Sequence, residues 1–421
     1  SDNWMDLSLP IGNGQLGAMI FGGIGCDEIQ FNEKTVWTGR PNGIEKKANY
    51  GEYRNFGNLY ISHRGIKTDT KITDYRRWLD IRNAVAGMTY SIDGVRYDRE
   101  YIASSPDGMI AVMLRASGKE KINVDLLLKD GNTDYNGTAS GTKIDKGNMT
   151  FKGKLTYLSY YCRVAVTPYG KKAKMSINDS ALTITKADSL LVLLSGGTNY
   201  STETANYRTN ESVLHQRIDD IINKALAKNY TTLKTRQQKS HRMLFDRCQL
   251  SITPDDCNTK PTPQLVADYN KTDSSYLDNH FLEELYFNYG RYLLISCAQG
   301  IALPSNLQGI WNYSNSAVWH CDIHANINVQ MNYWPAEIFA LSECHEPMFD
   351  LIRETALSGE RTARDYYHLD GWVAHHNVDL WRMTQPACEN ASWFFWPFGG
   401  VWMCQHLWTH YEYTRDEKFL R

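Results

Sequence analysis

The sequence lacks an excess of charge of either sign. It contains 45 Lys and Arg against 47 Asp and Glu, which gives a net charge of −2 and a pI of about 6.6. Proteins that bind nucleic acids or membrane surfaces usually carry a basic face, so this balance gives no electrostatic basis for either partner. The sequence also lacks an apolar run of the roughly 18 residues that a membrane span requires. We therefore expect neither a nucleic-acid nor a membrane partner.

The sequence lacks a pairing pattern among its cysteines, which are scattered along the chain. There are nine cysteines, an odd number, and no two of them have Cys-x-x-Cys spacing. This argues against a zinc knuckle or a redox pair, and we expect most of the thiols to be small buried apolar groups. The chain begins at Ser1 without a signal peptide, which we interpret as a processed or trimmed start. We expect an extracytoplasmic protein, either periplasmic or secreted.

One glycine motif matches the sequence pattern of a dinucleotide-binding loop, but the segments on either side of it do not fit such a loop. Residues 12–17, GNGQLG, fit Gly-x-Gly-x-x-Gly. A dinucleotide site needs a strand before this loop and a helix after it. We expect no strand before Gly12, and a strand rather than a helix after Gly17. The glycines are interpreted as tight turns between strands, and no cofactor is expected.

The chain is long and rich in aromatic side chains. Its 421 residues suggest at least two domains, and 12 Trp and 26 Tyr suit carbohydrate recognition as well as a large core. From about 50 to 200, short apolar stretches alternate with Asp-Gly and Asn-Gly turns, a pattern typical of a large antiparallel β-sandwich. Residues 211–248 have helical spacing with a break near Asn229, and we expect a strand at 249–254 and a loop at 253–264. Later helices separated by long loops predict a toroid of helix pairs.

The stretch from 303 to 344 alternates polar side chains with large aromatics. In an extended chain every second side chain shares a face, so His324, Asn326 and Asn328 would project together. Ala325 and Ile327 would then turn into the protein. Three tryptophans flank this segment as flat plates of the kind that stack on a sugar ring: Trp311, Trp319 and Trp334. The pattern favours a concave ligand site, although a polar loop that bonds its own backbone fits the same letters.

Three other polar positions each allow two interpretations. Asn306 either bonds a sugar or caps the turn that follows it. His376 either bonds sugar hydroxyls or serves as a buried donor to backbone carbonyls. Glu337 resembles a catalytic carboxylate, but it opens a helix after a proline, where an acidic residue complements the helix dipole. A structural role is therefore favoured for Glu337.

His406 and His410 have the i, i+4 spacing of a zinc protease helix. Such a site also requires a glutamate directly after the first histidine, and Leu407 occupies that position. No metal site is expected.

Six long segments carry a specific pattern: LPIGNGQLGAMIFGG, IQFNEKTVWTGRPN, LPSNLQGIWN, HANINVQMNYWPAE, GWVAHHNVDLWR and WPFGGVWMCQHLW. Together they resemble glycoside hydrolase family 95, the inverting α-L-fucosidases and related α-L-galactosidases. The resemblance runs through essentially the whole chain. It implies an N-terminal antiparallel β super-sandwich at residues 1–205 and a helical linker with a returning strand and loop at 206–275. An incomplete (α/α)6 catalytic barrel would follow at 276–421. Because full-length members continue further, it also implies a missing C-terminal portion of the same protein.

The resemblance also implies catalytic roles. An inverting glycosidase protonates the leaving oxygen with a carboxylic acid and activates a water on the opposite face. In the family a carboxylate and two asparagines hold that water, and the asparagines map onto Asn326 and Asn328. An amide oxygen fixes a water well, while the partner Asp is expected beyond residue 421. The expected substrate-binding residues are His324, Trp311, Trp319, Asn306, His376 and Trp334.

The general acid has two possible placements. The family often has Glu where Thr409 stands in HLWTHY, and a hydroxyl is far too weak an acid to replace it. We favour a Glu in a later loop of the barrel mouth, because loops usually hold the chemistry. Glu389 and Glu412 are further candidates. On either of the first two placements, these 421 residues alone are expected to lack a working acid–base pair.

Three functions stay open at this point. The first is an exo-acting hydrolase that releases terminal, 1,2-linked α-L-fucose from an oligosaccharide with inversion. L-galactose is the alternative sugar, and a side chain near the ring, where His324 lies, can discriminate between the two. The second is a catalytically impaired, sugar-binding homologue. The third is a phosphorylase of related architecture, which needs a phosphate site that this stretch does not reveal.

Overall fold

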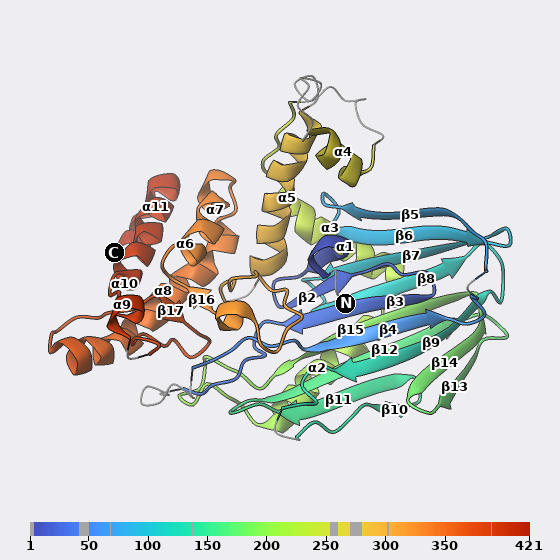
Figure 1. The fold of residues 1–421 in the computed structure, drawn as a ribbon, viewed down its shortest axis with the longest axis horizontal. Coiled ribbons are helices and arrows are strands. Elements are labelled where there is room, and N and C mark those ends of the chain that lie inside the picture. The colour runs from blue at the N-terminus through green and yellow to red at the C-terminus, as the bar shows by residue number, and fades with distance from the viewer. Residues whose placement is uncertain are drawn as a thin grey trace.

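The computed structural model describes residues 4–41, 50–67, 69–135, 138–252, 260–269, 280–300, 303–388 and 390–421. Glu389 lies outside these residues, as does most of the expected loop at 253–264. Antiparallel sheets form the N-terminal half, and helices joined by long loops form the C-terminal half (Figure 1). The strands of the sheets are β1 (Leu9–Gly12), β2 (Leu16–Ile20), β3 (Cys26–Glu33), β4 (Gly57–His63), β5 (Ile72–Asp80), β6 (Val85–Ile92), β7 (Val95–Ser104), β8 (Met109–Ala116), β9 (Ile122–Asp130), β10 (Lys143–Asp145), β11 (Asn148–Lys154), β12 (Ser159–Tyr169), β13 (Lys174–Asn178), β14 (Ala181–Ala187) and β15 (Ser189–Thr198).

Two sheets pack face to face in the N-terminal half. Their strand orders are β1-β2-β3-β4-β9-β14-β13 and β10-β11-β12-β15-β8-β7-β6-β5. One apolar core fills the space between them, with Phe31 and Leu59 from the first sheet and Val112 and Val192 from the second. The alternation of apolar residues with turns therefore correctly predicted a sandwich.

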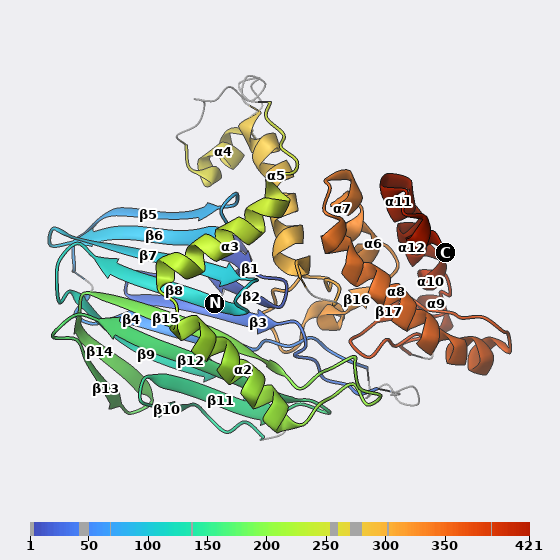
Figure 2. The same cartoon turned by 180° about the vertical axis from the view of Figure 1, so that it is seen from behind.

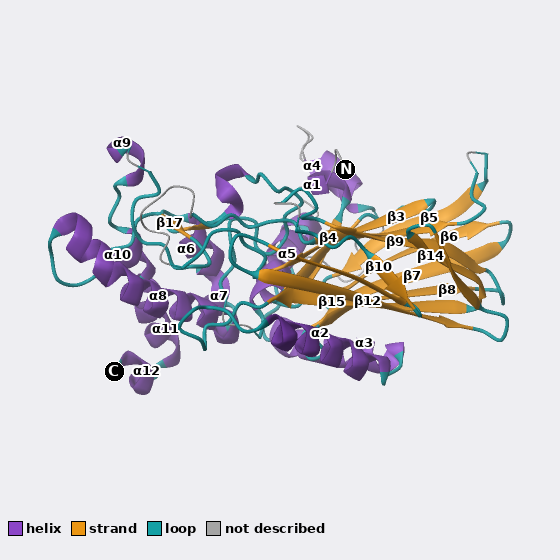
Figure 3. Cartoon of the chain, turned by 90° about the horizontal axis from the view of Figure 1, so that it is seen from below, coloured by secondary structure: helices purple, strands orange, loops and turns teal. Residues whose placement is uncertain are grey.

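Strand β15 is buried along nearly its whole length because both of its faces are covered. Leu190, Val192 and Leu194 belong to the sandwich core, whereas Leu191 and Leu193 pack with residues of two helices. A continuous apolar run is the sequence signature of such two-sided burial. The two helices, α2 (Glu211–Leu226) and α3 (Tyr230–Phe245), lie across the outer face of the second sheet (Figures 2 and 3).

The predicted break between these helices is confirmed. Asn229 precedes α3 in an extended conformation, and its side chain accepts a hydrogen bond from the Thr232 N–H at 2.8 Å. The strand expected to follow does not form in the described residues 249–252. Instead, the Arg291 guanidinium donates to the carbonyl oxygens of Phe245 and Cys248, at 2.9 and 2.5 Å, and so holds this segment against helix α5 (Phe281–Ala298).

The GNGQLG segment is a hairpin turn. Strand β1 does precede it, contrary to our expectation, and β2 follows it, so the missing helix still excludes a dinucleotide loop. Gly14 has φ +90°, and its N–H donates to the Ser296 carbonyl at 2.8 Å. A Cβ at Gly14 would lie 1.9 Å from the Gln299 carbonyl oxygen. The glycine therefore permits close approach to the helical half as well as the turn.

A short helix, α1 (Trp4–Leu7), precedes the first strand. Helices dominate the C-terminal half, whose elements are α4 (Thr262–Tyr269), α5 (Phe281–Ala298), a 3-10 helix (Val318–Cys321), β16 (Ile323–His324), α6 (Asn328–Tyr333), α7 (Pro335–Ile338), α8 (Ser342–Thr362), a π-helix (Ala363–Tyr367), β17 (Asn377–Val378), α9 (Ala391–Phe394), α10 (Gly399–Met403), α11 (Gln405–Thr414) and α12 (Glu417–Leu420). None of the described helices combines the length and apolarity needed to cross a membrane.

Three of the hydrogen bonds that join the two halves run from side chains of the helical half to backbone carbonyls of the sandwich half. The donors and acceptors are Tyr292 Oη to Pro10 O at 2.7 Å, Trp311 Nε1 to Ile11 O at 2.9 Å and Trp381 Nε1 to Thr38 O at 2.9 Å. These contacts bring the end of the sandwich against the loops that carry the predicted site.

Candidate active site

A two-stranded ribbon brings two of the predicted site residues together. Strand β16 pairs antiparallel with β17, and His324 lies opposite Asn377 in this pair. The Ala325 N–H also donates to the His376 carbonyl at 2.7 Å. The rings of His324 and His376 consequently lie 5.2 Å apart. His324 is 14% exposed and His376 is 8% exposed, so both rings are near the surface without being free in solvent.

The prediction of an extended segment at 324–328 is wrong. Residues 325–327 form a turn, and α6 begins at Asn328. Gln330 is fully buried, and its side chain donates to the Ala325 carbonyl at 2.8 Å and accepts from the Ile327 N–H at 3.1 Å. This amide satisfies backbone groups that a neighbouring strand would otherwise have bonded.

The two asparagines still lie close together in the chain, but they do not share a strand face. Asn326 is exposed on the turn, and Asn328 is half-buried at the start of α6. Among the described residues, neither side-chain amide has a protein hydrogen-bond partner. Both amides are therefore available to a ligand or a water.

Asp322 organises the base of this site, and our sequence predictions missed it. The carboxylate is fully buried; its Oδ1 lies 2.7 Å from His324 Nδ1, and its Oδ2 accepts from Asn377 Nδ2 at 2.7 Å. Tyr50 Oη also donates to Oδ2. Burial, reinforced by the Asp322 charge, raises the pKa of Tyr50 well above its ordinary value, so the phenol keeps its proton. Asp322 stands two residues before His324, a spacing that did signal a shared strand face.

The three tryptophans occupy different environments. Trp319 is 68% exposed and Trp334 is 49% exposed, so both present apolar surface to solvent. Trp311 requires a correction, because it is 6% exposed and packs between the two halves. Its Nε1 donates to Ile11 O, and a Cβ at Gly17 would lie 3.1 Å from that nitrogen. Trp311 therefore cannot offer a flat face to a sugar.

Asn306 also lies in the interior, at 3% exposure. Its Oδ1 accepts from the Gln308 N–H at 2.9 Å, and its backbone pairs with Gly309. Asn306 therefore caps the turn that follows it, which was the second of its two interpretations. The prediction that its side chain binds sugar is corrected to this structural role.

The histidines next to β17 differ from each other. His375 is fully buried, with Nδ1 2.7 Å from the Thr384 carbonyl and Nε2 2.8 Å from Tyr367 Oη. His376 instead stacks on Phe394, with centroids 5.6 Å apart, and faces His324. Burial lowers the pKa of His376, and the neighbouring His324 lowers it further. A neutral His376 can either donate or accept towards a hydroxyl group.

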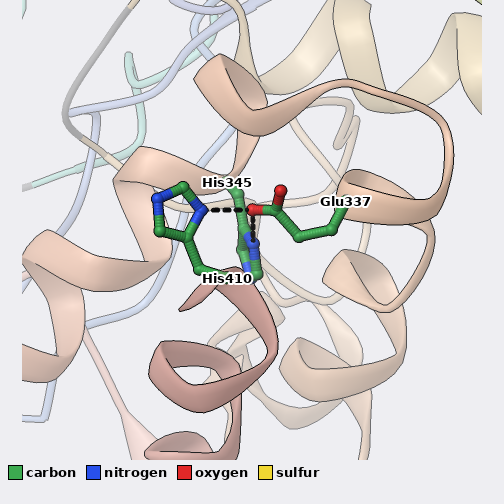
Figure 4. A group of neighbouring side chains, drawn as sticks. All are labelled: Glu337, His345 and His410. Atoms are coloured by element: carbon green, nitrogen blue, oxygen red, sulfur yellow. Dashed lines mark hydrogen bonds and ion pairs between the residues drawn. The ribbon is translucent and has the colours of Figure 1, made fainter. Parts of the chain in front are cut away.

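A second polar cluster is centred on Glu337 (Figure 4). Its Oε1 accepts from Nδ1 of His345 at 2.8 Å and from Nδ1 of His410 at 2.7 Å, and Ser342 Oγ donates to Oε2 at 2.6 Å. Burial favours a raised pKa for Glu337, but these hydrogen bonds outweigh it and lower the pKa to about 2. The cluster joins α7, α8 and α11, which agrees with the structural role favoured for this glutamate.

Glu337, His345 and His410 also form the metal-ligand grouping that the described residues contain, with donor atoms within 4.8 Å of one another. A zinc ion would need each nitrogen unprotonated and about 2.0–2.1 Å from the metal. Here both Nδ1 atoms lie at hydrogen-bond distance from one carboxylate oxygen, so their protons occupy that space. His406 does not join His410 in this group, because its Nδ1 lies 2.8 Å from His345 Nε2. The geometry fits a hydrogen-bonded hub better than a metal centre.

Of the two further candidates for the acid within this chain, Glu412 is exposed on α11 and Glu389 lies outside the described residues. Thr409, where the family often has Glu, is half-buried on the same helix. None of these positions alters the expectation that a threonine hydroxyl cannot supply the proton.

Comparison with known proteins first defines the class. Residues 1–51 and 43–203 match the glycosyl hydrolase family 65 N-terminal domain. The whole chain superposes on 55% of a solved structure titled "Putative kojibiose phosphorylase from human microbiome", with a TM-score of 0.66 and 13% sequence identity. The fold, a β-sandwich followed by a helical region, is therefore shared with that structure.

A second family model matches the C-terminal half. Residues 229–421 match the glycosyl hydrolase family 95 catalytic domain. It is 30% identical to Alpha-L-fucosidase 2 of Arabidopsis thaliana, over all of this chain and 56% of that protein. It is 27% identical to "Probable alpha-fucosidase A" of Aspergillus niger, over all of this chain and 57% of that protein. The chain thus spans little more than half the length of these relatives.

Proposed function

We propose that the chain forms part of an exo-acting glycoside hydrolase that releases terminal, 1,2-linked α-L-fucose from oligosaccharides with inversion. The observation that carries this proposal is that, among the described residues, the Asn326 and Asn328 amides have no protein hydrogen-bond partner. They follow closely in sequence on His324, whose ring neighbours His376, within the region that matches the family 95 catalytic domain. In this proposal the two asparagines hold the attacking water, and the imidazoles contact sugar hydroxyls. Trp319 and Trp334 supply exposed apolar faces for the sugar.

The division of the chain belongs to the same proposal. Residues 1–205 would be the β super-sandwich, 206–275 the linker and 276–421 the first part of an (α/α)6 barrel. Several large apolar side chains in and beside the last helices are exposed, as a partial barrel would leave them: Trp393, Phe398, Val401, Trp408 and Leu420. A further portion of the same protein, with the acid and the base, would complete the barrel. An extracytoplasmic location suits a protein that meets free oligosaccharides.

Calorimetry and product analysis together test this function. We expect the 421-residue chain to bind L-fucose, and Asn326→Ala and Asn328→Ala each to weaken that binding by about tenfold. Asn178→Ala, at an exposed position on β13, is the matched control and should leave binding unchanged. We expect no fucose release from an α-1,2-linked fucoside by this chain. Normal hydrolysis would instead place both carboxylates within these residues, and tighter binding of L-galactose would favour an α-L-galactosidase.

A further inference from the structure

We propose that Asp322 is a positioning residue for the sugar site, and that it works by fixing the ring of His324. This inference rests on the proposed function, because it assigns His324 to the sugar. Asp322 has no solvent exposure and collects three donors from three separate segments: His324 on β16, Asn377 on β17 and Tyr50 from the sandwich half.

The hydrogen-bond pattern sets the tautomer of His324. An ionised carboxylate only accepts hydrogen bonds, so His324 must carry a proton on Nδ1, the atom 2.7 Å from Asp322 Oδ1. In the neutral ring, Nε2 then carries a lone pair and can accept from a sugar hydroxyl. The neighbouring His376 ring, 5.2 Å away, limits the remaining rotation of the His324 ring. An orienting carboxylate behind a functional imidazole acts in this way in many sites.

The sandwich half takes part through Tyr50 and Gly51. Tyr50 donates to Asp322, and its ring meets the His320 ring edge-on at 5.0 Å. The Gly51 N–H donates to Asp379 Oδ2 at 2.8 Å, and a Cβ at Gly51 would lie 2.9 Å from that oxygen. Two carboxylates of the helical half therefore hold Tyr50 and Gly51 in place. Through Tyr50, the sandwich half contributes to the geometry of the sugar site.

Asp322→Asn separates this role from mere packing, because the two side chains have nearly the same shape. A carboxamide has one acceptor oxygen, whereas three donors converge on Asp322. If the amide oxygen of the substituted side chain accepts from Tyr50 and Asn377, the amide N–H faces Nδ1 of His324. The neutral His324 ring must then carry its proton on Nε2. If the oxygen turns to His324, the amide N–H meets the Asn377 amide donor. The substitution therefore either reverses the His324 tautomer or loosens its ring.

The test combines imidazole nitrogen NMR with calorimetry on the whole 421-residue chain. His324 signals are assigned with His324→Gln, and Arg353→Gln, in an exposed ion pair with Asp350 on α8, serves as the control. In the unsubstituted chain we expect the neutral His324 ring to be protonated on Nδ1 and unprotonated on Nε2. In Asp322→Asn we expect that pattern to be lost and L-fucose binding to weaken by about tenfold. Tyr50→Phe should give a smaller change in the same direction.

A double substitution distinguishes positioning from general destabilisation. If Asp322 acts through His324, adding Asp322→Asn to His324→Gln should weaken L-fucose binding no further. Unchanged His324 signals in Asp322→Asn, or fully additive losses in the double variant, would overturn the proposal. If the unsubstituted chain binds no L-fucose, the proposed function fails, and the His324 signals alone still decide whether Asp322 sets the ring.

Discussion

At the scale of single residues, Glu337 shows how a buried carboxylate stays charged. Two imidazole N–H groups and a hydroxyl point at it, and its pKa falls to about 2 from an ordinary value of 4.5. A carboxyl group whose folded-state pKa is lowered contributes stability above its unfolded pKa. The contribution of Glu337 is therefore complete above about pH 4.5 and is lost as the pH falls towards 2.

Glu337→Gln should lower the free energy of unfolding by about 2–3 kcal/mol at pH 7, because an amide accepts less strongly and presents an N–H to a donor. The loss relative to the unsubstituted chain should shrink as the pH falls from 4.5 to 2. Urea denaturation at pH 7 and pH 3 measures both effects. Glu360→Gln, at an exposed position on α8, should change stability little at either pH. A constant difference between Glu337→Gln and the unsubstituted chain would contradict this account.

The residue scale also shows what sequence can and cannot predict about the site. His324 and His376 were identified from their neighbours in the sequence, and the structure brings their rings together. Trp311 and Trp319 are the same residue type in the same polar stretch, yet of these two only Trp311 is buried. It packs against the sandwich half, where its hydrogen-bond acceptor Ile11 lies 300 positions away in the sequence. Contacts at such separations leave no local pattern. Likewise, the side chain of Gln330 stabilises the turn at 325–327 through two backbone hydrogen bonds. The presence of a glutamine in the sequence does not by itself reveal that role.

At the scale of elements, helices α2 and α3 offer an internal comparison. Asn210 and Asn229 each precede a helix in an extended conformation, but only Asn229 accepts a hydrogen bond from its helix. Such a cap satisfies one of the free N–H groups of the first turn.

Asn229→Ala should therefore lower stability by about 1 kcal/mol, whereas Asn210→Ala should cost less than half of that. Thermal and chemical denaturation of the two variants, made in parallel, measures the difference. Equal losses would mean that the extended backbone before each helix, rather than the side-chain cap, determines stability there.

Element prediction succeeded where a period had room to repeat. The 16 residues of α2 and the 18 of α5 carry several turns of apolar spacing, and the sandwich strands are bounded by clear turns. Strands β16 and β17 have two residues each, too few for any period, yet they bring His324 close to His376. The part of the fold that builds the site was thus the part with least local signal.

At the scale of the whole molecule, buried polar groups join the two halves. Asn32 of β3 is fully buried; its Nδ2 donates to the Asn312 carbonyl at 2.7 Å, and its Oδ1 accepts from the Asn312 N–H at 2.9 Å. This reciprocal pair fixes the loop after Trp311 against the sandwich.

Asn32→Ala should lower the free energy of unfolding by about 2–3 kcal/mol, because the buried Asn312 N–H loses its partner and the Asn312 carbonyl keeps only the Gln30 amide, at 3.1 Å. Nine of the 12 tryptophans lie after residue 303, so fluorescence reports mainly on the helical half and far-ultraviolet circular dichroism on both. We expect the two signals to change together in the unsubstituted chain. Asn178→Ala is the exposed control. Separate transitions without any substitution would show that the halves unfold independently.

Three of the contacts between the halves use main-chain oxygens of Pro10, Ile11 and Thr38 as acceptors. Every amino acid provides that oxygen, so these three hydrogen bonds place little restriction on which side chains occupy those positions. The sandwich can accumulate substitutions there while its orientation to the helices persists. These three positions therefore tolerate divergence in sequence, whereas a contact such as that of Asn32 with Asn312 depends on its side chain.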